Sequence, residues 1–514
     1  MRWLASRRGR IFVVAWMFYS LHFATNVVRE HYPAFSIAQH GTFRVDEYQG
    51  FHADIFVHKD GHAVIGNQVF VSMLAAVPLF VFNPVLDRIE AYSKAKIASE
   101  GVPAGGYRID KPNRQKFFQL VKERGLDLRF GAATAVTSVF FMAPITAAFL
   151  VFFYGVLLTR GLEARTATGL TFLLGFGTPL FFRTSTLNHN LFVMYAMFIA
   201  FVLLWLPSRG LTTFAEATVV GRSLARRPKA PGSRRFWAGF FGGITLATDY
   251  VGVIILPLLW IYFVVTRARA SSWRTALSES TAIVLGTLPP IAFLLYSQWS
   301  MYGNPFLPGQ YWMPNQNVFV DVGARGWTLP DPQLFLMNLF DPSFGMYVWA
   351  PILLLALVPV RRYRDESLIL PRPERRWLAV TWVAFLVFAS SNQYSRLQFN
   401  SGFRYLVPLV PFLMLALADH WVRLPRGWRA GVAGVAMLHA WVLTVFREPV
   451  GQSWRMFLAE GPQLPWYRVL GLTSSPDNPW LGTWLVPTLL MALTAAIAAG
   501  FWRLGDRWEQ THGV

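Results

Sequence analysis

The segment Tyr48–Gln68, "YQGFHADIFVHKDGHAVIGNQ", places three histidines, two aspartates and several amides between two apolar stretches of the chain. Side chains of these types donate and accept hydrogen bonds, bind metals and transfer protons. Composition alone leaves two interpretations open. The segment is either a solvated loop without a chemical role or part of a reaction site.

Four carboxylates follow the first apolar stretch closely: Glu30, Asp46, Glu47 and Asp54. A charged carboxylate at the edge of a low-dielectric region is costly, so its affinity for a proton tends to rise. That property suits a general base, and we take Glu30, Asp54 and Asp46 as candidate catalytic residues. The alternative is that all four are interfacial carboxylates in contact with water.

Six of the ten histidines lie between His22 and His62, which raises the question of a metal site. The spacing supports a metal poorly, because Gly61 between His58 and His62 argues against a helix that would align them. We therefore expect hydrogen-bonding histidines in a loop, no cofactor and no assigned metal ligands. His62 is kept as a candidate substrate-binding residue.

Polar residues also interrupt the apolar stretches further along the chain. In "RTSTLNHN", Thr186 or Asn188 is suited to cap a helix, and His189 is a candidate for substrate binding. Asp249 divides the apolar block Phe236–Val265, which predicts two helices meeting at a polar turn. An acid at the membrane edge is a functional candidate by default, and capping the second helix is the equal alternative.

Composition places these groups in a membrane protein. Hydrophobic residues make up 54% of the 514 residues and charged residues 14%, against about 25% in an average soluble domain. The net charge of +20 comes from short basic runs separated by apolar segments, so we expect no nucleic-acid partner, which would need clustered charge. The chain has no cysteine, which excludes disulfides and thiolate chemistry.

The apolar segments predict an all-α, polytopic bundle of about 12–14 transmembrane helices, since about 20 apolar residues cross a bilayer. The chain is expected to form one integral-membrane domain over residues 1–514. The clearer segments are Ile11–Val28, Val69–Phe82, Phe130–Leu158, Thr166–Phe182, Leu191–Leu206, Phe236–Val265, Ala282–Tyr296, Met346–Val360, Trp377–Phe388, Phe403–Leu417, Gly431–Phe446 and Leu481–Trp502. Pro144 leaves open whether Phe130–Leu158 is one helix or two.

Basic residues predict the orientation, because they favour cytoplasmic loops. The first ten residues and the segments 221–235, 361–376 and 422–429 are rich in arginine, so we expect them, and hence the N-terminus, on the cytoplasmic side. The polar loops 29–68, 298–343 and 447–480 then face outward, carrying short interfacial helices. The mixed-charge tract Asp87–Asp127 is not placed by this rule.

Two arginines lie near the outward start of a late apolar stretch, Arg396 and Arg404 in "SRLQFNSGFRYLVPLVPF". Outward arginines run against the charge rule and call for a reason. One reason is phosphate binding, because the guanidinium offers a fork of donors to phosphate oxygens. Pairing with a loop carboxylate is the alternative.

Taken in order, six stretches resemble the GT-C superfamily of integral-membrane glycosyltransferases, and more closely its bacterial branch related to protein mannosyltransferases and aminoarabinose transferases. The likeness covers about Arg29 to Leu417. The stretches are "REHYPAFSIAQHGTFRVDEY", "DGHAVIGNQVFVSMLAAVPLF", "GFGTPLFFRTSTLNHN", "ATDYVGVIILPLLWIY", "MYGNPFLPGQYW" with "NLFDPSFGMYVWAPILLL", and "GFRYLVPLVPFL".

The resemblance carries over to a few positions. The family's catalytic acid, usually Asp, precedes an Ile-Ala pair, and Glu30 stands at that position before Ile37-Ala38. Arg404 and Tyr405 match an Arg-Tyr pair of the family. In some members a Lys before the second helix meets the lipid phosphate, but the segment around Asn67 here reads "IGNQ" and lacks it.

The resemblance implies an inverting transfer of a sugar from a polyprenyl-phosphate donor to a glycan, lipid or protein acceptor at the outer face of a bacterial inner membrane. Glu30, or else Asp54, would deprotonate the acceptor hydroxyl. Arg404, with Tyr405 and Arg396, would stabilise the departing phosphate, and His189, Asp249, His62 and Asn67 would complete the binding site. The alternatives are a lipid or polysaccharide transporter and a non-catalytic protein on the same scaffold, because a fold alone does not establish activity.

Overall fold

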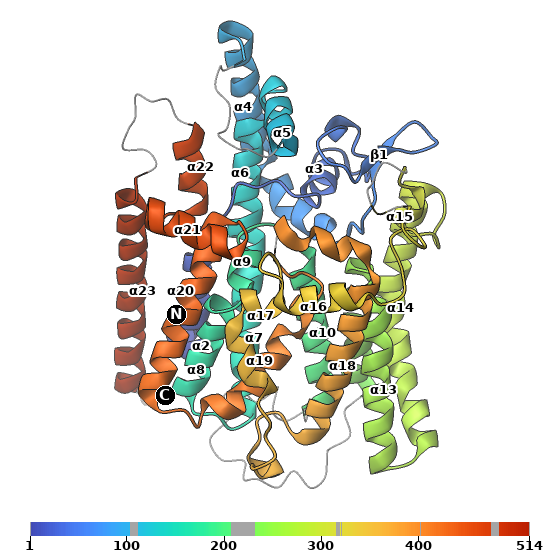
Figure 1. Ribbon diagram of the computed structural model, residues 1–514, viewed down its shortest axis with the longest axis vertical. Helices are drawn as coiled ribbons and strands as arrows, with labels where there is room; N and C mark the ends of the chain where they lie inside the picture. The colour runs from blue at the N-terminus through green and yellow to red at the C-terminus, as the bar shows by residue number, and fades with distance from the viewer. Residues whose placement is uncertain are drawn as a thin grey trace. The chain divides into compact units, whose positions relative to one another are not determined.

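The computed structural model describes residues 2–102, 112–206, 232–314, 319, 321–400, 402–473 and 483–512 (Figure 1). The chain folds as two compact units. Unit 1 comprises Met1–Ala148, Phe181–Asn188 and Trp441–Val514, and unit 2 comprises Phe149–Leu180 and His189–Ala440. Both units are built from helices, as predicted, and the two strands among the described residues belong to one short hairpin.

Unit 1 contains the predicted first outward loop and the helices that follow it. Its elements are α1 Arg2–Ala5, α2 Arg7–Leu21, α3 His31–His40, η1 Asp46–Tyr48, β1 Ile55–Val57, β2 Ala63–Ile65, α4 Phe70–Glu100, α5 Pro112–Glu123, α6 Asp127–Thr137, the π-turn η2 Ser138–Met142, α9 Leu180–Thr184, α21 Val450–Glu460, α22 Pro465–Thr473 and α23 Leu485–His512. Helix α7, Ala143–Thr159, begins in unit 1 and ends in unit 2, and α20, Arg426–Phe446, begins in unit 2 and ends in unit 1.

The first outward loop is ordered by a short helix and a hairpin. Helix α3 ends at Gly41, whose φ of 66° is the left-handed conformation that glycine adopts readily. Strands β1 and β2 pair antiparallel with Ile55 opposite Ile65, and Gly61, with a φ of 84°, forms the turn between them. The prediction that Gly61 keeps His58 and His62 out of a helix is therefore confirmed.

Unit 2 contains the remaining apolar helices. They are α8 Ala164–Phe176, α10 His189–Trp205, α12 Gly232–Thr248, α13 Gly252–Ala270, α14 Trp273–Tyr302, α15 Gly309–Trp312, α16 Pro332–Phe340, α17 Met346–Trp349, η3 Pro351–Leu357, η4 Asp365–Ser367, α18 Arg372–Ser391, η5 Gln393–Asn400, η6 Val407–Leu409 and α19 Val410–Trp421. The predicted pair of helices on either side of Asp249 is confirmed by α12 and α13.

Six helices in the described part of the chain are long and apolar enough to cross a membrane. They are Phe70–Glu100, Asp127–Thr159, Gly252–Ala270, Trp273–Tyr302, Arg426–Phe446 and Leu485–Thr511, and two shorter apolar helices cover His189–Trp205 and Val407–Trp421. The helical class agrees with the sequence, while a total of 12–14 crossings stays a prediction. Most of the basic segment 221–235, and residues 315–318, 320 and 474–480 of the outward loops, lie outside the described residues.

Two predicted segments are interrupted at prolines, whereas the predicted segment Ile11–Val28 is helical only as far as Leu21, where α2 ends without a proline. The segment Met346–Val360 is not one α-helix, because Pro351 forces Ala350 out of the helical region (φ −144°, ψ 70°) and a 3-10 turn follows. Thr166–Phe182 is likewise interrupted, between α8 and α9, at Pro179. Pro144, by contrast, does not split its segment, since it lies in the first turn of α7, directly after the π-turn η2.

Candidate functional site

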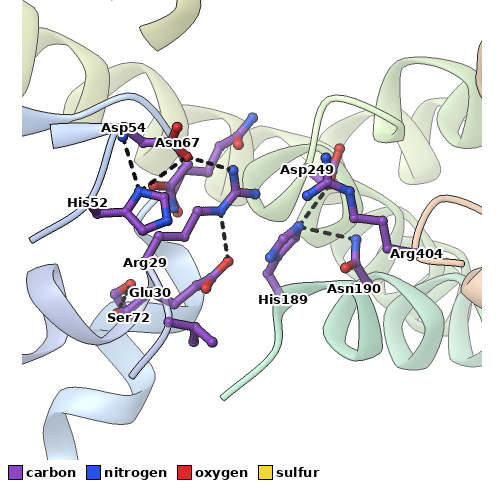
Figure 2. Close-up of polar contacts among 12 residues, drawn as sticks. Arg29, Glu30, His52, Asp54, Asn67, Ser72, His189, Asn190, Asp249 and Arg404 are labelled. Atoms are coloured by element: carbon purple, nitrogen blue, oxygen red, sulfur yellow. Dashed lines mark hydrogen bonds and ion pairs between the residues drawn. The ribbon is translucent and has the colours of Figure 1, made fainter. Parts of the chain in front are cut away.

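Two of the predicted bases meet at one arginine in unit 1. Arg29 Nε lies 3.2 Å from Oε1 of Glu30, and its Nη1 lies 3.2 Å from Oδ2 of Asp54 (Figure 2). Glu30 is 4% exposed and sits at the N-cap position of α3, without capping it through its side chain. One guanidinium thus joins a buried and a part-buried carboxylate that stand 24 residues apart in the chain.

Backbone contacts hold this Arg29 cluster (Arg29, Glu30 and Asp54) in place. The hairpin returns the chain so that Gly66 N–H donates to the Asp54 carbonyl at 2.9 Å. At the start of α4, Ser72 Oγ donates to the Glu30 carbonyl at 2.7 Å. The segment between Gly66 and Ser72 is therefore tied at one end to Asp54 and at the other to Glu30.

His31, next to Glu30, is fully buried and fixes the start of α3. Its Nε2 lies 3.1 Å from the hydroxyl of Thr137, and its Nδ1 lies 3.1 Å from the N–H of Val28. The Thr137 hydroxyl donates to backbone carbonyls of its own helix, so the imidazole donates from Nε2 and accepts at Nδ1. Burial lowers the pKa of His31 to about 4, which keeps the ring neutral.

Asp46 and His62 support the hairpin rather than the Arg29 cluster. Asp46 accepts from the N–H of Ala63 at 2.5 Å through Oδ1 and lies 3.1 Å from His62 Nδ1 through Oδ2. Both side chains are about half exposed. These contacts give Asp46 a structural place in the loop, so we no longer favour it as the base.

Asn67 lies at the position where the resembled family carries its lysine. The side chain is buried, donates from Nδ2 to the Gln68 carbonyl at 3.1 Å, and leaves Oδ1 without a partner among the described residues. Gln68 Nε2 is likewise buried without a partner there. A pair of neutral amides thus stands where a cation was expected from the resemblance.

Unit 2 brings His189 and Asp249 together. His189 Nε2 lies 3.1 Å from Asp249 Oδ2, and the side-chain nitrogen of Asn190 lies 3.1 Å from the same ring nitrogen (Figure 2). Asp249 also accepts from Val251 N–H at 3.1 Å, which stabilises the turn before α13, whose N-cap residue is Val251. A functional role for this acid stays a prediction. His189 opens α10 directly after Asn188, while Thr186 donates to the Asn26 carbonyl and therefore does not cap that helix.

The two outward arginines have different surroundings within unit 2. Arg396 pairs with Asp331 at 2.6 Å, as the carboxylate alternative predicted. Arg404 donates to the hydroxyl of Tyr405 at 2.9 Å and lies over its ring, and no described carboxylate pairs with it. Its Nε is buried without a partner in the described structure. Arg404 is therefore the better candidate for an anion.

The sequence predictions missed Arg29. A signal for it exists in the sequence, because Arg29 lies in a loop predicted to face outward, as do Arg396 and Arg404. The candidate residues fall into two sets, with Glu30, Asp46, Asp54, His62 and Asn67 in unit 1 and His189, Asp249, Arg396, Arg404 and Tyr405 in unit 2.

No group of three or more histidine, aspartate or glutamate side chains among the described residues is arranged to hold a metal ion. The chain matches no family model, no curated protein and no solved structure. The chemical interpretation therefore depends on the geometry of these residues and on the resemblance carried by the sequence motifs.

Proposed function

We propose that the protein is an inverting glycosyltransferase that moves a sugar from a polyprenyl-phosphate donor to an acceptor hydroxyl at the outer face of a bacterial inner membrane. The observation that carries this proposal is the Arg29 cluster. It joins a buried carboxylate, Glu30, and a second one, Asp54, through one guanidinium. The described part of the chain also has six helices long and apolar enough to cross a membrane.

The reaction needs one base and one stabilised leaving group. Glu30, or else Asp54, takes the proton from the acceptor hydroxyl, whose oxygen forms a bond to the anomeric carbon of the donor sugar. The bond between that carbon and the phosphate oxygen breaks with inversion. Polyprenyl phosphate leaves with the bonding electron pair, and the proton passes from the carboxylate to solvent.

Arg29 has a clear part in this scheme. Burial disfavours a charged carboxylate, and a neighbouring guanidinium opposes that cost by favouring the ionised form, which is the form that can accept a proton. Within unit 2, Arg404 with Tyr405 is the candidate for binding a phosphate group. A guanidinium with free donors binds phosphate oxygens well, whereas Arg396 already has a carboxylate partner.

The proposal is tested with purified wild-type protein in nanodiscs and short-chain polyprenyl-phosphate mannose, glucose and galactose. Release of polyprenyl phosphate is followed with and without added acceptors such as a Ser/Thr peptide or a lipid-linked glycan. We expect at least one donor to be turned over, with an inverted anomeric centre in the product. Movement of intact donor across liposomes without cleavage would instead favour the transporter, and neither cleavage nor movement would favour the non-catalytic protein.

A further inference from the structure

We propose that Asn67 and Gln68 form a recognition site for sugar hydroxyls, in place of the phosphate-binding lysine that the resemblance would put there. The inference rests on the proposed function and deepens it, because it names a part of the substrate that unit 1 recognises. The group that binds is a neutral sugar hydroxyl. It belongs either to the donor sugar or to a sugar acceptor.

The first step is position. Asn67 and Gln68 lie in the short segment whose ends are tied to the two candidate bases, through Gly66 N–H to the Asp54 carbonyl and through Ser72 Oγ to the Glu30 carbonyl. A segment of this length cannot depart far from its fixed ends. Figure 2 shows Asn67 beside Asp54 and Arg29, which places the amide next to the Arg29 cluster.

The second step is unmet hydrogen bonding. Asn67 is only 6% exposed, yet its Oδ1 has no partner among the described residues, and the Nε2 of the neighbouring Gln68 is in the same condition. Asn67 uses its own Nδ2 on the Gln68 carbonyl, which fixes the amide and directs Oδ1 away from that carbonyl. Buried polar atoms are almost always satisfied, so two adjacent exceptions point to a bound group.

The third step is the type of group. The pair offers one acceptor, Asn67 Oδ1, and one donor, Gln68 Nε2. A hydroxyl both donates and accepts, so it has the chemistry that each of the two atoms lacks. A phosphate only accepts, and it would face the unpartnered oxygen of Asn67 without forming a bond to it. The amides therefore fit a sugar hydroxyl and do not replace the missing lysine.

The experiment compares the donor that wild type turns over with its 2-, 3-, 4- and 6-deoxy analogues. Wild type should lose roughly tenfold or more in kcat/KM for one deoxy analogue, because the unmatched amides stay unpaired. In Asn67→Ala and Gln68→Ala, the kcat/KM values for the full donor and for that deoxy analogue should become nearly equal. The ratio of two substrates in one preparation does not depend on how much of a variant is folded, and Asn67→Ser retains a polar group if Asn67→Ala does not fold.

Two arms separate the source of the hydroxyl. The first arm measures hydrolysis of the deoxy donors without an acceptor. If the variants show a smaller loss than wild type there, the amides bind the donor sugar. If the variants show a smaller loss only with deoxy acceptors in the full transfer reaction, the amides bind the acceptor. Gln49→Ala, an exposed amide of the same loop, should keep the wild-type ratios. Unchanged ratios in all variants while wild type is active would overturn the inference and leave the proposed function standing, whereas an inactive wild type would overturn both.

Discussion

Arg29 is the residue on which the candidate site in unit 1 depends, because its guanidinium contacts both Glu30 and Asp54. The two carboxylates were predicted from their place after the first apolar helix. Their shared partner, Arg29, was not predicted. The hairpin brings Asp54 to Arg29 although the two are distant in the sequence, and no local sequence pattern indicates such a contact. For the same reason the sequence did not predict the contact of Asp46 with the hairpin, which only the paired strands reveal.

Replacing Arg29 with Gln should destabilise the fold by about 1–3 kcal/mol, because Glu30 is then a buried charge without its counter-ion. Adding Glu30→Gln to this variant should restore part of the loss. The measurement is thermal unfolding of the two single variants and the double variant. Arg44→Gln is the matched control. Arg44 contacts Asp60 at 3.9 Å, and such an exposed ion pair contributes little to the free energy of unfolding. Equal losses for Arg29→Gln and Arg44→Gln would contradict the role given to Arg29.

His31 predicts how stability depends on pH. The pKa is lowered to about 4 in the folded chain from 6.5 in the unfolded chain, so between these values only the unfolded chain binds the proton. Stability should therefore fall as the pH decreases through this window, by about 1.4 kcal/mol per pH unit for this one group. His31→Gln should flatten the dependence of the unfolding temperature between pH 7 and 5. Exposed His40→Gln is the control, and parallel profiles for His31→Gln and wild type would refute the assignment.

At the scale of elements, the packing of α12 against α14 shows what the sequence patterns predict and what they do not. The helices themselves were predicted from the apolar segments Phe236–Val265 and Ala282–Tyr296 and from the break at Asp249. Their close contact was not, because only the packed structure shows that Gly239 faces the backbone of Ile283 and Gly286 faces the backbone of Phe236. Small residues allow helices in membranes to approach this closely.

A single methyl group should disturb this crossing. In Gly286→Ala the new Cβ would overlap the carbonyl oxygen of Phe236, so α12 and α14 must separate and the yield of folded protein should fall sharply. Gly431→Ala, in α20, is the matched control because its Cβ would meet nothing within 4 Å. Size-exclusion profiles and unfolding temperatures in detergent provide the comparison. A Gly286→Ala protein as stable as Gly431→Ala would show that the two helices do not pack as closely as described.

At the scale of the whole molecule, the tract that the charge rule could not place is linked to the first outward loop. Arg124 donates to the carbonyls of Glu47 and Gln49 at 2.9 and 3.2 Å. Helix α4 is long and apolar enough to cross a membrane, yet it begins beside Glu30 and leads into this tract. An odd number of crossings must separate an outward loop 29–68 from a cytoplasmic segment 221–235. If α6–α7, α8 and α10 each cross, a crossing by α4 would make the number even. We therefore expect that α4 does not cross, although its apolar stretch Val69–Phe82 was predicted to span the membrane.

Cysteine labelling tests this topology directly, because the natural chain contains no cysteine. Lys59→Cys in the hairpin turn and Ser99→Cys near the end of α4 should both react with a membrane-impermeant maleimide in intact spheroplasts. Ser367→Cys, in the basic segment 361–376, should react only after permeabilisation. All three positions are exposed, so access to the side chain does not limit the reaction. If Ser99→Cys behaves like Ser367→Cys, α4 crosses the membrane and the expected orientation must be revised.

The central claim is that a carboxylate of the Arg29 cluster is the base in sugar transfer. The most direct measurement is the initial rate of polyprenyl-phosphate release from the donor by wild type, Glu30→Gln, Asp54→Asn and Glu47→Gln. Glu47 is the matched control, since it is an exposed carboxylate of the same loop. We predict that Glu30→Gln lowers the rate by about 100-fold or more, as loss of a general base does, while Glu47→Gln leaves it near wild type. Wild-type rates in both Glu30→Gln and Asp54→Asn would contradict the claim.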